Sequence, residues 1–230
     1  MLTKSSVFFS IVLLVGLFAF SANATPISYT EEAAFMTAIS CFEQQTLDFE
    51  NSDVGDLIPS GDSLKGIAFS YDLFGESMAV VDEYDTTSGD NSLGLTLDGK
   101  IEGDNCFWDG DEFDLSFDPV HAIGMYFITS DPALTEEIRL KTQWGTAYNS
   151  ADNRLLSDGG LAYFVGMISD EAFSSAHIGF AADGESNFVY NVDDITLASG
   201  KAFNPVPEPA SLLLFGCGLI GLLAVKRCRH

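Results

Sequence analysis

Carboxylates are the side chains of this sequence that could most readily do chemistry, since its 230 residues carry 34 Asp and Glu against 10 Lys and Arg. Two carboxylates on either side of a glycosidic bond could hydrolyse it, but among so many acids a candidate pair is easily found by chance. The densest runs, residues 82–85 and 108–112, lack the ligand spacing of an EF-hand loop. We therefore interpret both runs as solvated loop charge and assign no catalytic residue.

Other reactive residue types give little further support for catalysis. His121 and His177 lie in apolar, alternating stretches without the close spacing of zinc ligands. The sequence contains no G-x-S-x-G pattern to present a serine nucleophile. Residues 216–221 match G-x-G-x-x-G, but they lie inside an apolar run close to the end of the chain, where no dinucleotide fold can follow. We expect a protein that is not an enzyme.

Composition also limits the possible partners. A formal net charge of -24 leaves no basic surface that could hold phosphates, so nucleic acid is not expected as a partner. The same charge disfavours docking on anionic lipid headgroups. Hydrophobic residues make up 47% of the chain and include 19 Phe, which excludes intrinsic disorder and supplies a sizeable core.

The hydrophobic pattern predicts an all-β fold with one short N-terminal helix. Thr30 can cap that helix, and apolar residues recur with helical spacing from residue 34 to residue 42. After that the period changes to two, and turns rich in Gly, Asp, Asn and Ser separate short strands, which is typical of a β-sandwich or jelly roll. The expected strands are residues 46–50, 66–71, 77–81, 93–97, 112–117, 121–129, 137–142, 162–169, 177–182 and 187–198.

The N-terminus has the pattern of a secretory signal peptide. Lys4 provides a positive charge, an apolar run covers residues 7–20, and an A-x-A site predicts cleavage between Ala24 and Thr25. The alternative is a first transmembrane helix, but the run is shorter than the about 20 residues that a bilayer requires. We expect residues 1–24 to be removed and the remainder of the chain to be exported.

Export places the cysteines in an oxidising compartment. Cys217 and Cys228 belong to the C-terminal tail, which leaves Cys41 and Cys106 between the two ends of the chain. A disulfide between Cys41 and Cys106 is possible in such a compartment. The alternative is two separate buried thiols.

The C-terminus combines three features at residues 206–230. Val206-Pro207-Glu208-Pro209 precedes an uncharged apolar run, residues 210–225, and a basic tail, residues 226–230. As a helix the run would reach about 24 Å against a hydrocarbon core of about 30 Å, so it is a marginal membrane span and the basic side chains must snorkel at its end. The basic tail would then stay on the cytoplasmic side.

This tripartite pattern resembles the PEP-CTERM sorting signal of Gram-negative bacteria. The resemblance implies two partners, the export machinery and an exosortase that cuts near Val206-Pro207-Glu208-Pro209. It also implies a route, from an anchor in the inner membrane to the cell surface or the extracellular matrix.

Residues 25–205 contain no linker and no internal repeat, so one domain is expected between the two ends. The order of its segments is a helix, Leu47-Asp48-Phe49-Glu50, then residues 108–124, 163–166 and 188–195. This order looks like the exported jelly-roll domain of PEP-CTERM proteins and, more distantly, like carbohydrate-binding jelly rolls.

The second resemblance implies a structural calcium ion. In many jelly-roll modules a Glu of the first strand and an Asp of the last strand share Ca²⁺ with backbone carbonyls, and Glu50 and Asp193 match those places. Ca²⁺ prefers oxygen ligands, and a cation that joins distant segments stabilises the folded state. The alternative is that Asp193 and Asp194 cap the end of a strand or bind backbone amides.

Aromatic residues near polar loops are the candidate ligand contacts. Sugar-binding jelly rolls stack pyranose faces on such rings, and Trp108 and Trp144 are the first candidates here, with Tyr84 and Tyr148 beside them. Packing beneath loops is the alternative for each ring. We expect a non-enzymatic protein of the cell surface or extracellular matrix. The alternatives are a carbohydrate-binding module that uses these aromatics and calcium, and a hydrolase that uses paired carboxylates.

Overall fold

Alternating apolar residues build the strands of this domain, and the computed structural model describes them in residues 26–97, 105–108, 110–180 and 188–200. These residues form one helix, α2 (Glu32–Ala38), and fourteen strands that are linked by hydrogen bonds. The strands are β1 (Ile27–Tyr29), β2 (Glu43–Leu47), β3 (Leu57–Ile58), β4 (Ser63–Leu64), β5 (Ile67–Tyr71), β6 (Glu76–Val81), β7 (Ser92–Leu97), β8 (Phe107–Trp108), β9 (Phe113–Thr129), β10 (Ile138–Thr142), β11 (Gly145–Tyr148), β12 (Arg154–Leu155), β13 (Leu161–Phe180) and β14 (Val189–Ser199).

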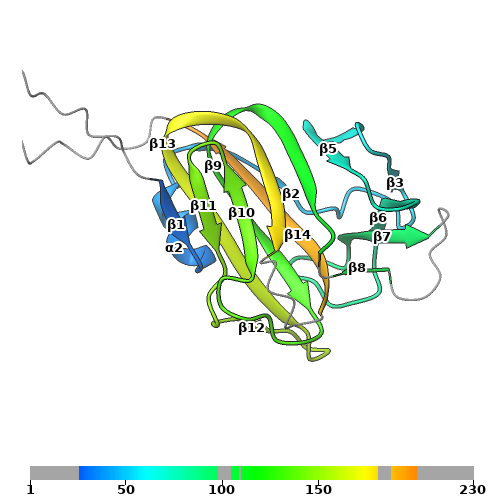
Figure 1. The fold of residues 1–230 in the computed structure, drawn as a ribbon. Helices are drawn as coiled ribbons and strands as arrows, with labels where there is room; N and C mark the ends of the chain where they lie inside the picture. Colours follow the sequence, from blue (N-terminus) through cyan, green and yellow to red (C-terminus); the bar gives the residue numbers. More distant parts are fainter. Residues whose placement is uncertain (1–25, 98–104, 109, 181–187, 201–230) are drawn as a thin grey trace, which may run out of the picture. The chain divides into compact units, whose positions relative to one another are not determined.

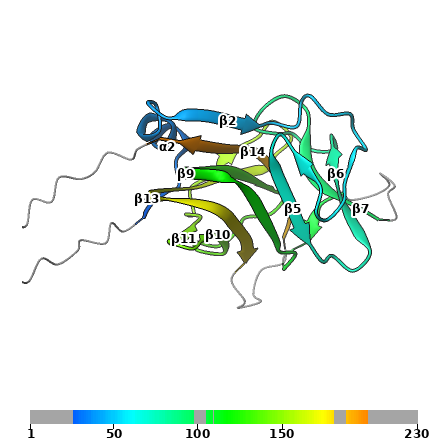
Figure 2. The ribbon, with the colours of Figure 1, turned by 90° about the horizontal axis from the view of Figure 1, so that it is seen from above.

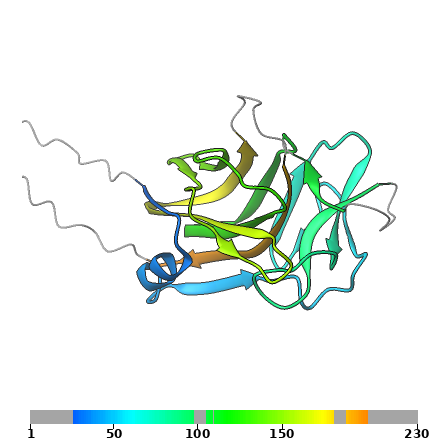
Figure 3. The same ribbon diagram turned by 90° about the horizontal axis from the view of Figure 1, so that it is seen from below.

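Three long antiparallel strands form the centre of the sheet. The order is β11-β10-β13-β9-β14-β7-β6-β3, and Figure 1 shows the long strands β13, β9 and β14 side by side. β2 pairs with the last residues of β14, and β5 pairs with the first residues of β9. Seen from above and from below, β3, β5, β6 and β7 gather at one end and α2 lies at the other (Figures 2 and 3).

A bend divides β9 into two halves. From Phe113 to Asp118 its residues are alternately buried and exposed, whereas from Ala122 to Thr129 all are buried. Pro119 lies between the halves and has no N–H for the ladder, and the pairing with β13 shifts register at the same place. The second half is therefore covered on both faces.

Each of the two faces has its own hydrophobic cluster. The inner cluster is the main core and contains side chains of most strands, including Phe69, Phe107, Phe127, Phe173 and Tyr190. The outer cluster lies where α2 packs on the sheet and contains Phe35, Ile39, Ala122, Tyr126, Ile128 and Phe164. The outer face of β9 and β14 is thus an interior surface and not a solvated one.

A bulge interrupts β14 in the middle of this outer face. Its pairing with β9 shifts register between Asp193 and Thr196, and Asp194 has a φ of 53°, which side chains other than glycine seldom adopt. Tyr190 and Val192 belong to the inner core. Since side chains alternate along a strand, Asn191 and Asp193 face outward.

The first and last strands place the two ends of the described domain close together. Ile27 pairs with Ile168, Ile168 with Ala122, and Ala122 with Ala198, so four strands lie in one row. Three strand spacings separate Ile27 from Ala198, which gives about 14 Å. Figure 1 shows β1 beside α2, and Figure 2 shows the end of β14 beside α2.

The structure confirms the all-β fold and corrects several details of the sequence-based interpretation. The helix begins after Glu31, which makes no side-chain cap hydrogen bond, so Thr30 is not its cap. The pairs of strands expected at 112–117 and 121–129, and at 162–169 and 177–182, are each one continuous strand. The expected first strand at 46–50 is observed earlier, as β2, so Glu50 follows that strand and does not belong to it.

The two hydrophobic ends, including the signal peptide and the helix expected at residues 210–225, lie outside the described residues. Within the described ranges no helix is long and apolar enough to cross a membrane.

Candidate functional site

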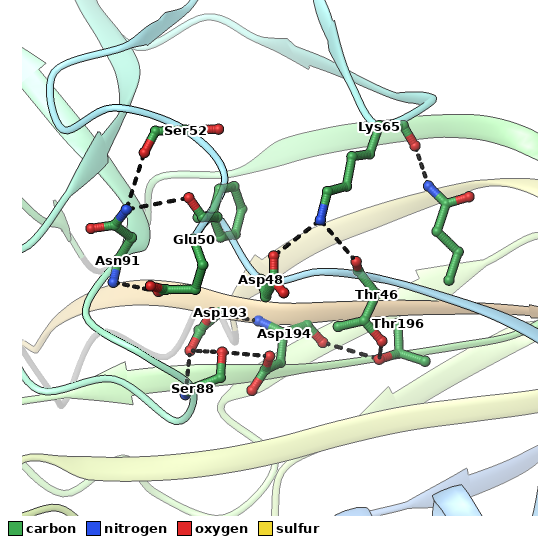
Figure 4. A network of polar contacts seen from close by, with 12 residues as sticks. Thr46, Asp48, Glu50, Ser52, Lys65, Ser88, Asn91, Asp193, Asp194 and Thr196 are labelled. Atoms are coloured by element: carbon green, nitrogen blue, oxygen red, sulfur yellow. Dashed lines mark hydrogen bonds and ion pairs between the residues drawn. The ribbon is translucent and has the colours of Figure 1, made fainter.

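The bulge of β14 brings two neighbouring carboxylates under a single loop. Asp193 is completely buried, and its Oδ2 accepts hydrogen bonds from the backbone N–H groups of Thr87 and Ser88, both at 3.1 Å, and from the Thr87 hydroxyl at 2.8 Å. Its Oδ1 accepts the N–H of Asp194 at 2.7 Å. The Asp194 carboxylate accepts hydrogen bonds from the hydroxyls of Ser88 at 2.8 Å and Thr87 at 2.9 Å. Figure 4 shows Ser88 between the two acids.

Glu50 holds the other end of the same loop. Its Oε1 accepts the N–H group of Asp90 at 3.0 Å. It also accepts the N–H group of Asn91 at 2.7 Å (Figure 4). Gly89 has a φ of +57°, and a Cβ built there would lie 2.1 Å from the carboxyl carbon of Glu50. Glycine is therefore required where the loop passes the carboxylate. We call Glu50, Asp193 and Asp194, together with residues 87–91, the carboxylate clasp.

Burial gives Asp193 unusual acid–base behaviour. Loss of solvent, and after it the charge of Asp194, raise the pKa of Asp193 from 3.8 to about 7. The hydrogen bonds from Thr87, Ser88 and the Asp194 backbone act in the opposite direction without cancelling that rise. Asp193 is thus a carboxyl group whose ionisation costs free energy in the folded state.

The resemblance implies that Glu50 and Asp193 share a calcium ion, and the structure brings both carboxylates to the loop of residues 87–91. In the structure both carboxylates accept backbone N–H groups of that loop. No group of three or more His, Cys, Asp or Glu in the described residues could hold a metal ion. The arrangement matches the alternative expectation, in which Asp193 binds backbone amides.

A pocket of about 210 Å³ lies on the same outer face, near the start of β14. The sequence analysis did not anticipate it, because its walls come from five separate segments of the chain. Its lining includes Tyr84, Cys106, Ile128, Asp158, Val189 and Asn191. It is smaller than typical drug-sized sites and therefore suits a small ligand.

Asn191 supplies an acceptor inside this pocket. The residue is 2% exposed, and its Nδ2 donates a hydrogen bond to Ser92 Oγ at 3.1 Å. Its Oδ1 is buried and has no hydrogen-bond partner in the structure. Such a group is uncommon, because leaving a buried acceptor unsatisfied costs about 1–3 kcal/mol.

Two acidic loops are tied together at the edge of the pocket. The N–H of Asp85 donates to Asp158 Oδ2 and the N–H of Asp158 donates to Asp85 Oδ2, each at 3.0 Å. The Ser157 hydroxyl also donates to Asp85, and chiefly this bond lowers the pKa of the Asp85 carboxyl. Asp85, which lies in one of the two dense acidic runs, therefore has a structural role as an acceptor.

The structure separates the two candidate stacking tryptophans. Trp108 is 57% exposed and pairs with Val189, which lines the pocket. Trp144 is 43% exposed, and its Nε1 donates to the carbonyl of Ala172 at 3.2 Å. Trp144 precedes Gly145, which lies against Pro26 at the end of the domain where the chain enters.

The rows of paired residues show how far apart these places are. Tyr190, next to Val189, pairs with Thr129, whereas Ile27, next to Pro26, lies in the row of Ala122. Seven residues of β9 between Ala122 and Thr129 span about 23 Å. Trp108 and Trp144 therefore do not form one site, and only Trp108 lies near the pocket.

The disulfide that the sequence allows between Cys41 and Cys106 is not present. Cys41 is exposed and Cys106 is buried, and no disulfide joins them. The alternative of two buried thiols is correct for Cys106 only. Cys106 instead contributes to the wall of the pocket.

The two histidines have separate surroundings. His177 Nδ1 lies 3.0 Å from Asp114 and its Nε2 lies 3.4 Å from Glu112, on a part of the sheet exposed to solvent. His121 packs edge-on against Phe42. Exposed ion pairs of this kind contribute little to stability, and the two rings do not form a joint site.

Comparison with known protein families identifies the C-terminal segment. Residues 205–227 match the PEP-CTERM protein-sorting motif, which confirms the resemblance to a PEP-CTERM sorting signal at Val206-Pro207-Glu208-Pro209. The motif is processed by exosortase and implies export and membrane-anchored sorting in Gram-negative bacteria. No curated protein matches the sequence.

Proposed function

We propose that the domain is a non-enzymatic component of the cell surface or the extracellular matrix, delivered there by exosortase processing. The observation that carries the proposal is the PEP-CTERM motif at residues 205–227, attached to a rigid all-β domain. The proposal adds a destination and a role to the sorting that the motif implies.

The use of the acidic side chains supports a non-enzymatic role. Asp85, Asp158, Asp193 and Glu50 all accept backbone N–H groups and so hold loops in place. Catalytic carboxylates instead need an oxygen directed at the substrate. The carboxyl groups of this domain that are most engaged in hydrogen bonds therefore act as structural acceptors.

The experiment that tests this proposal follows the intact protein in its own host, with and without the exosortase. With the enzyme, we expect a protein in the surface or matrix fraction whose mass lacks the C-terminal tail. Without it, the tail should remain and the protein should stay with the inner membrane. Replacing Pro207, Glu208 and Pro209 by alanine should reproduce the second result. Intact protein in the cytosol would contradict the proposal.

A second candidate function is carbohydrate binding, and the position of Trp108 favours it. An exposed tryptophan beside a pocket is the arrangement in which an aromatic ring can stack on a sugar face. In a pull-down with extracellular polysaccharide, Trp108→Ala should reduce retention of the protein. Trp144→Ala is the matched control, since Trp144 is similarly exposed but distant from the pocket. Equal retention of both variants and the parent would remove this candidate.

The calcium ion that the carbohydrate-binding candidate would use can be tested in a separate experiment. Because the clasp oxygens already accept hydrogen bonds, we expect the melting temperature in Ca²⁺ to equal that in EDTA. A clear rise in Ca²⁺, lost in Glu50→Gln, would restore the calcium site expected from the sequence.

A further inference from the structure

We propose that the pocket beside Tyr84 and Asn191 binds one neutral pyranose ring, with Asn191 Oδ1 accepting a sugar hydroxyl. This inference rests on the carbohydrate-binding candidate and assigns it a site within the domain.

The unsatisfied oxygen defines what the ligand must supply. Asn191 is almost fully buried, one N–H of its Nδ2 is engaged by Ser92, and its Oδ1 has no partner. An acceptor requires a donor, and a hydroxyl is a neutral donor. Satisfying Oδ1 would recover the cost of leaving it buried without a partner.

The charges and hydrogen bonds of the site disfavour ionic ligands. A net charge of -24 disfavours an anion anywhere on this chain. A buried ammonium group would need a carboxylate partner, but both oxygens of Asp158, the acid in the wall, already accept N–H groups from Asp85 and Gly160. A neutral ligand remains.

The lining residues and the volume of the pocket favour a ligand that is a compact ring with apolar faces. Ile128, Val189 and Tyr84 line one part of the pocket, and hydroxyl-bearing Thr129 and Ser130 line another. A pyranose has C–H faces for the first surface and hydroxyls at its edge for the second. A volume of about 210 Å³ admits one such ring. Trp108, next to Val189, can contact the following unit of a chain.

The first test measures binding of neutral methyl pyranosides to the full-length protein in detergent by saturation-transfer NMR. We expect at least one of the gluco-, galacto- and manno- forms to bind, and glucuronate to bind more weakly. Asn191→Leu should weaken binding about tenfold or more, the effect of one buried hydrogen bond. Asp118→Ala is the control and should bind normally, because Asp118 is an exposed residue of β9 that does not line the pocket. Absence of binding, or unchanged binding by a folded Asn191→Leu, overturns the proposal.

The second test locates the ligand through the two thiols of the domain. Cys106 lines the pocket, whereas Cys41 is exposed and belongs to no wall of it. We expect the bound sugar to slow alkylation of Cys106 by iodoacetamide, followed by peptide mass, and to leave the rate at Cys41 unchanged. If Cys106 does not react even without sugar, then iodoacetamide, which is smaller than a pyranose, cannot enter the pocket. That result would overturn the proposal.

The two proposals fail in different ways. Polysaccharide retention that depends on Trp108 but gives no protection of Cys106 overturns the pocket alone. Loss of retention together with loss of sugar binding overturns both the pocket and the carbohydrate-binding candidate. Neither result affects the exosortase experiment, which depends only on the C-terminal motif.

Discussion

Asn191 and Asp193 stand two residues apart on the same face of β14, and they show how differently a buried polar side chain can be used. Both are covered by residues 84–91, and both are almost completely buried. Each carboxylate oxygen of Asp193 has a partner, whereas Oδ1 of Asn191 has none. Burial alone therefore does not distinguish a structural polar group from a candidate ligand contact. The two roles are distinguished by whether the buried side chain still has an acceptor atom without a hydrogen-bond partner.

The largest expected effect on stability is at Asp193, whose carboxylate oxygens all have hydrogen-bond partners. Asp193→Ala leaves the N–H groups of Thr87, Ser88 and Asp194 without an acceptor. We expect it to lower the free energy of unfolding by about 2–5 kcal/mol in urea denaturation. Asp118→Ala removes an exposed acid of β9 and should change stability by less than about 0.5 kcal/mol. Similar losses in both variants would show that the clasp is not a special contributor.

The pH dependence of stability should depend on the same residue. The folded-state pKa of Asp193, about 7, is above its ordinary value of 3.8, so between these values the folded state holds more protons than the unfolded state. The stabilisation is fully present below pH 3.8 and is lost as the pH rises to about 7. Relative to Asp193→Asn, the parent should lose up to about 1.4 kcal/mol per pH unit in this window. Parallel pH profiles would contradict the buried-acid assignment.

A smaller effect is expected at the glycine of the clasp. Gly89→Ala places a Cβ against Glu50, whereas Gly61→Ala has a φ of +97° but open space around it. We expect Gly89→Ala to cost about 1–3 kcal/mol and to exceed Gly61→Ala. Glu50→Ala should remove much of that excess in the double variant, since the clash is then absent. Additive losses would place the cost in the backbone and not in the contact.

The smallest effect on stability is expected at Asn191, whose Oδ1 has no hydrogen-bond partner. Asn191→Leu loses the bond to Ser92 but also removes a buried acceptor that had no partner. We expect a change below about 1 kcal/mol in the free energy of unfolding. A loss as large as that of Asp193→Ala would make Asn191 a structural residue and would weaken the contrast between the two sites.

The fold class could be predicted from the sequence because alternation is a local signal. The sequence did not predict which of the expected strands are continuous with one another. Asp118-Pro119 looks like a turn between two strands, yet Pro119 lies in the bend of a single strand, where the ladder is already irregular and its missing N–H costs little. Similarly, apolar residues 162–169 are continuous with 177–180, because β13 continues across a bulge.

The candidate site was only partly accessible to sequence reasoning. The resemblance brought Glu50 and Asp193 to one loop, but the loop itself, residues 87–91, carries no pattern that predicts which atoms it directs at them. The pocket unites Tyr84, Cys106, Asp158 and Asn191, which are far apart in the chain. Asn191 did carry a signal, since an amide in an otherwise apolar central strand needs an explanation.

The row that joins Ile27 to Ala198 has a consequence for how the domain is displayed. Both connections leave beside α2, while the pocket opens some seven residues farther along β9, about 23 Å away. Cutting the chain at either connection would therefore remove no residue that lines the pocket.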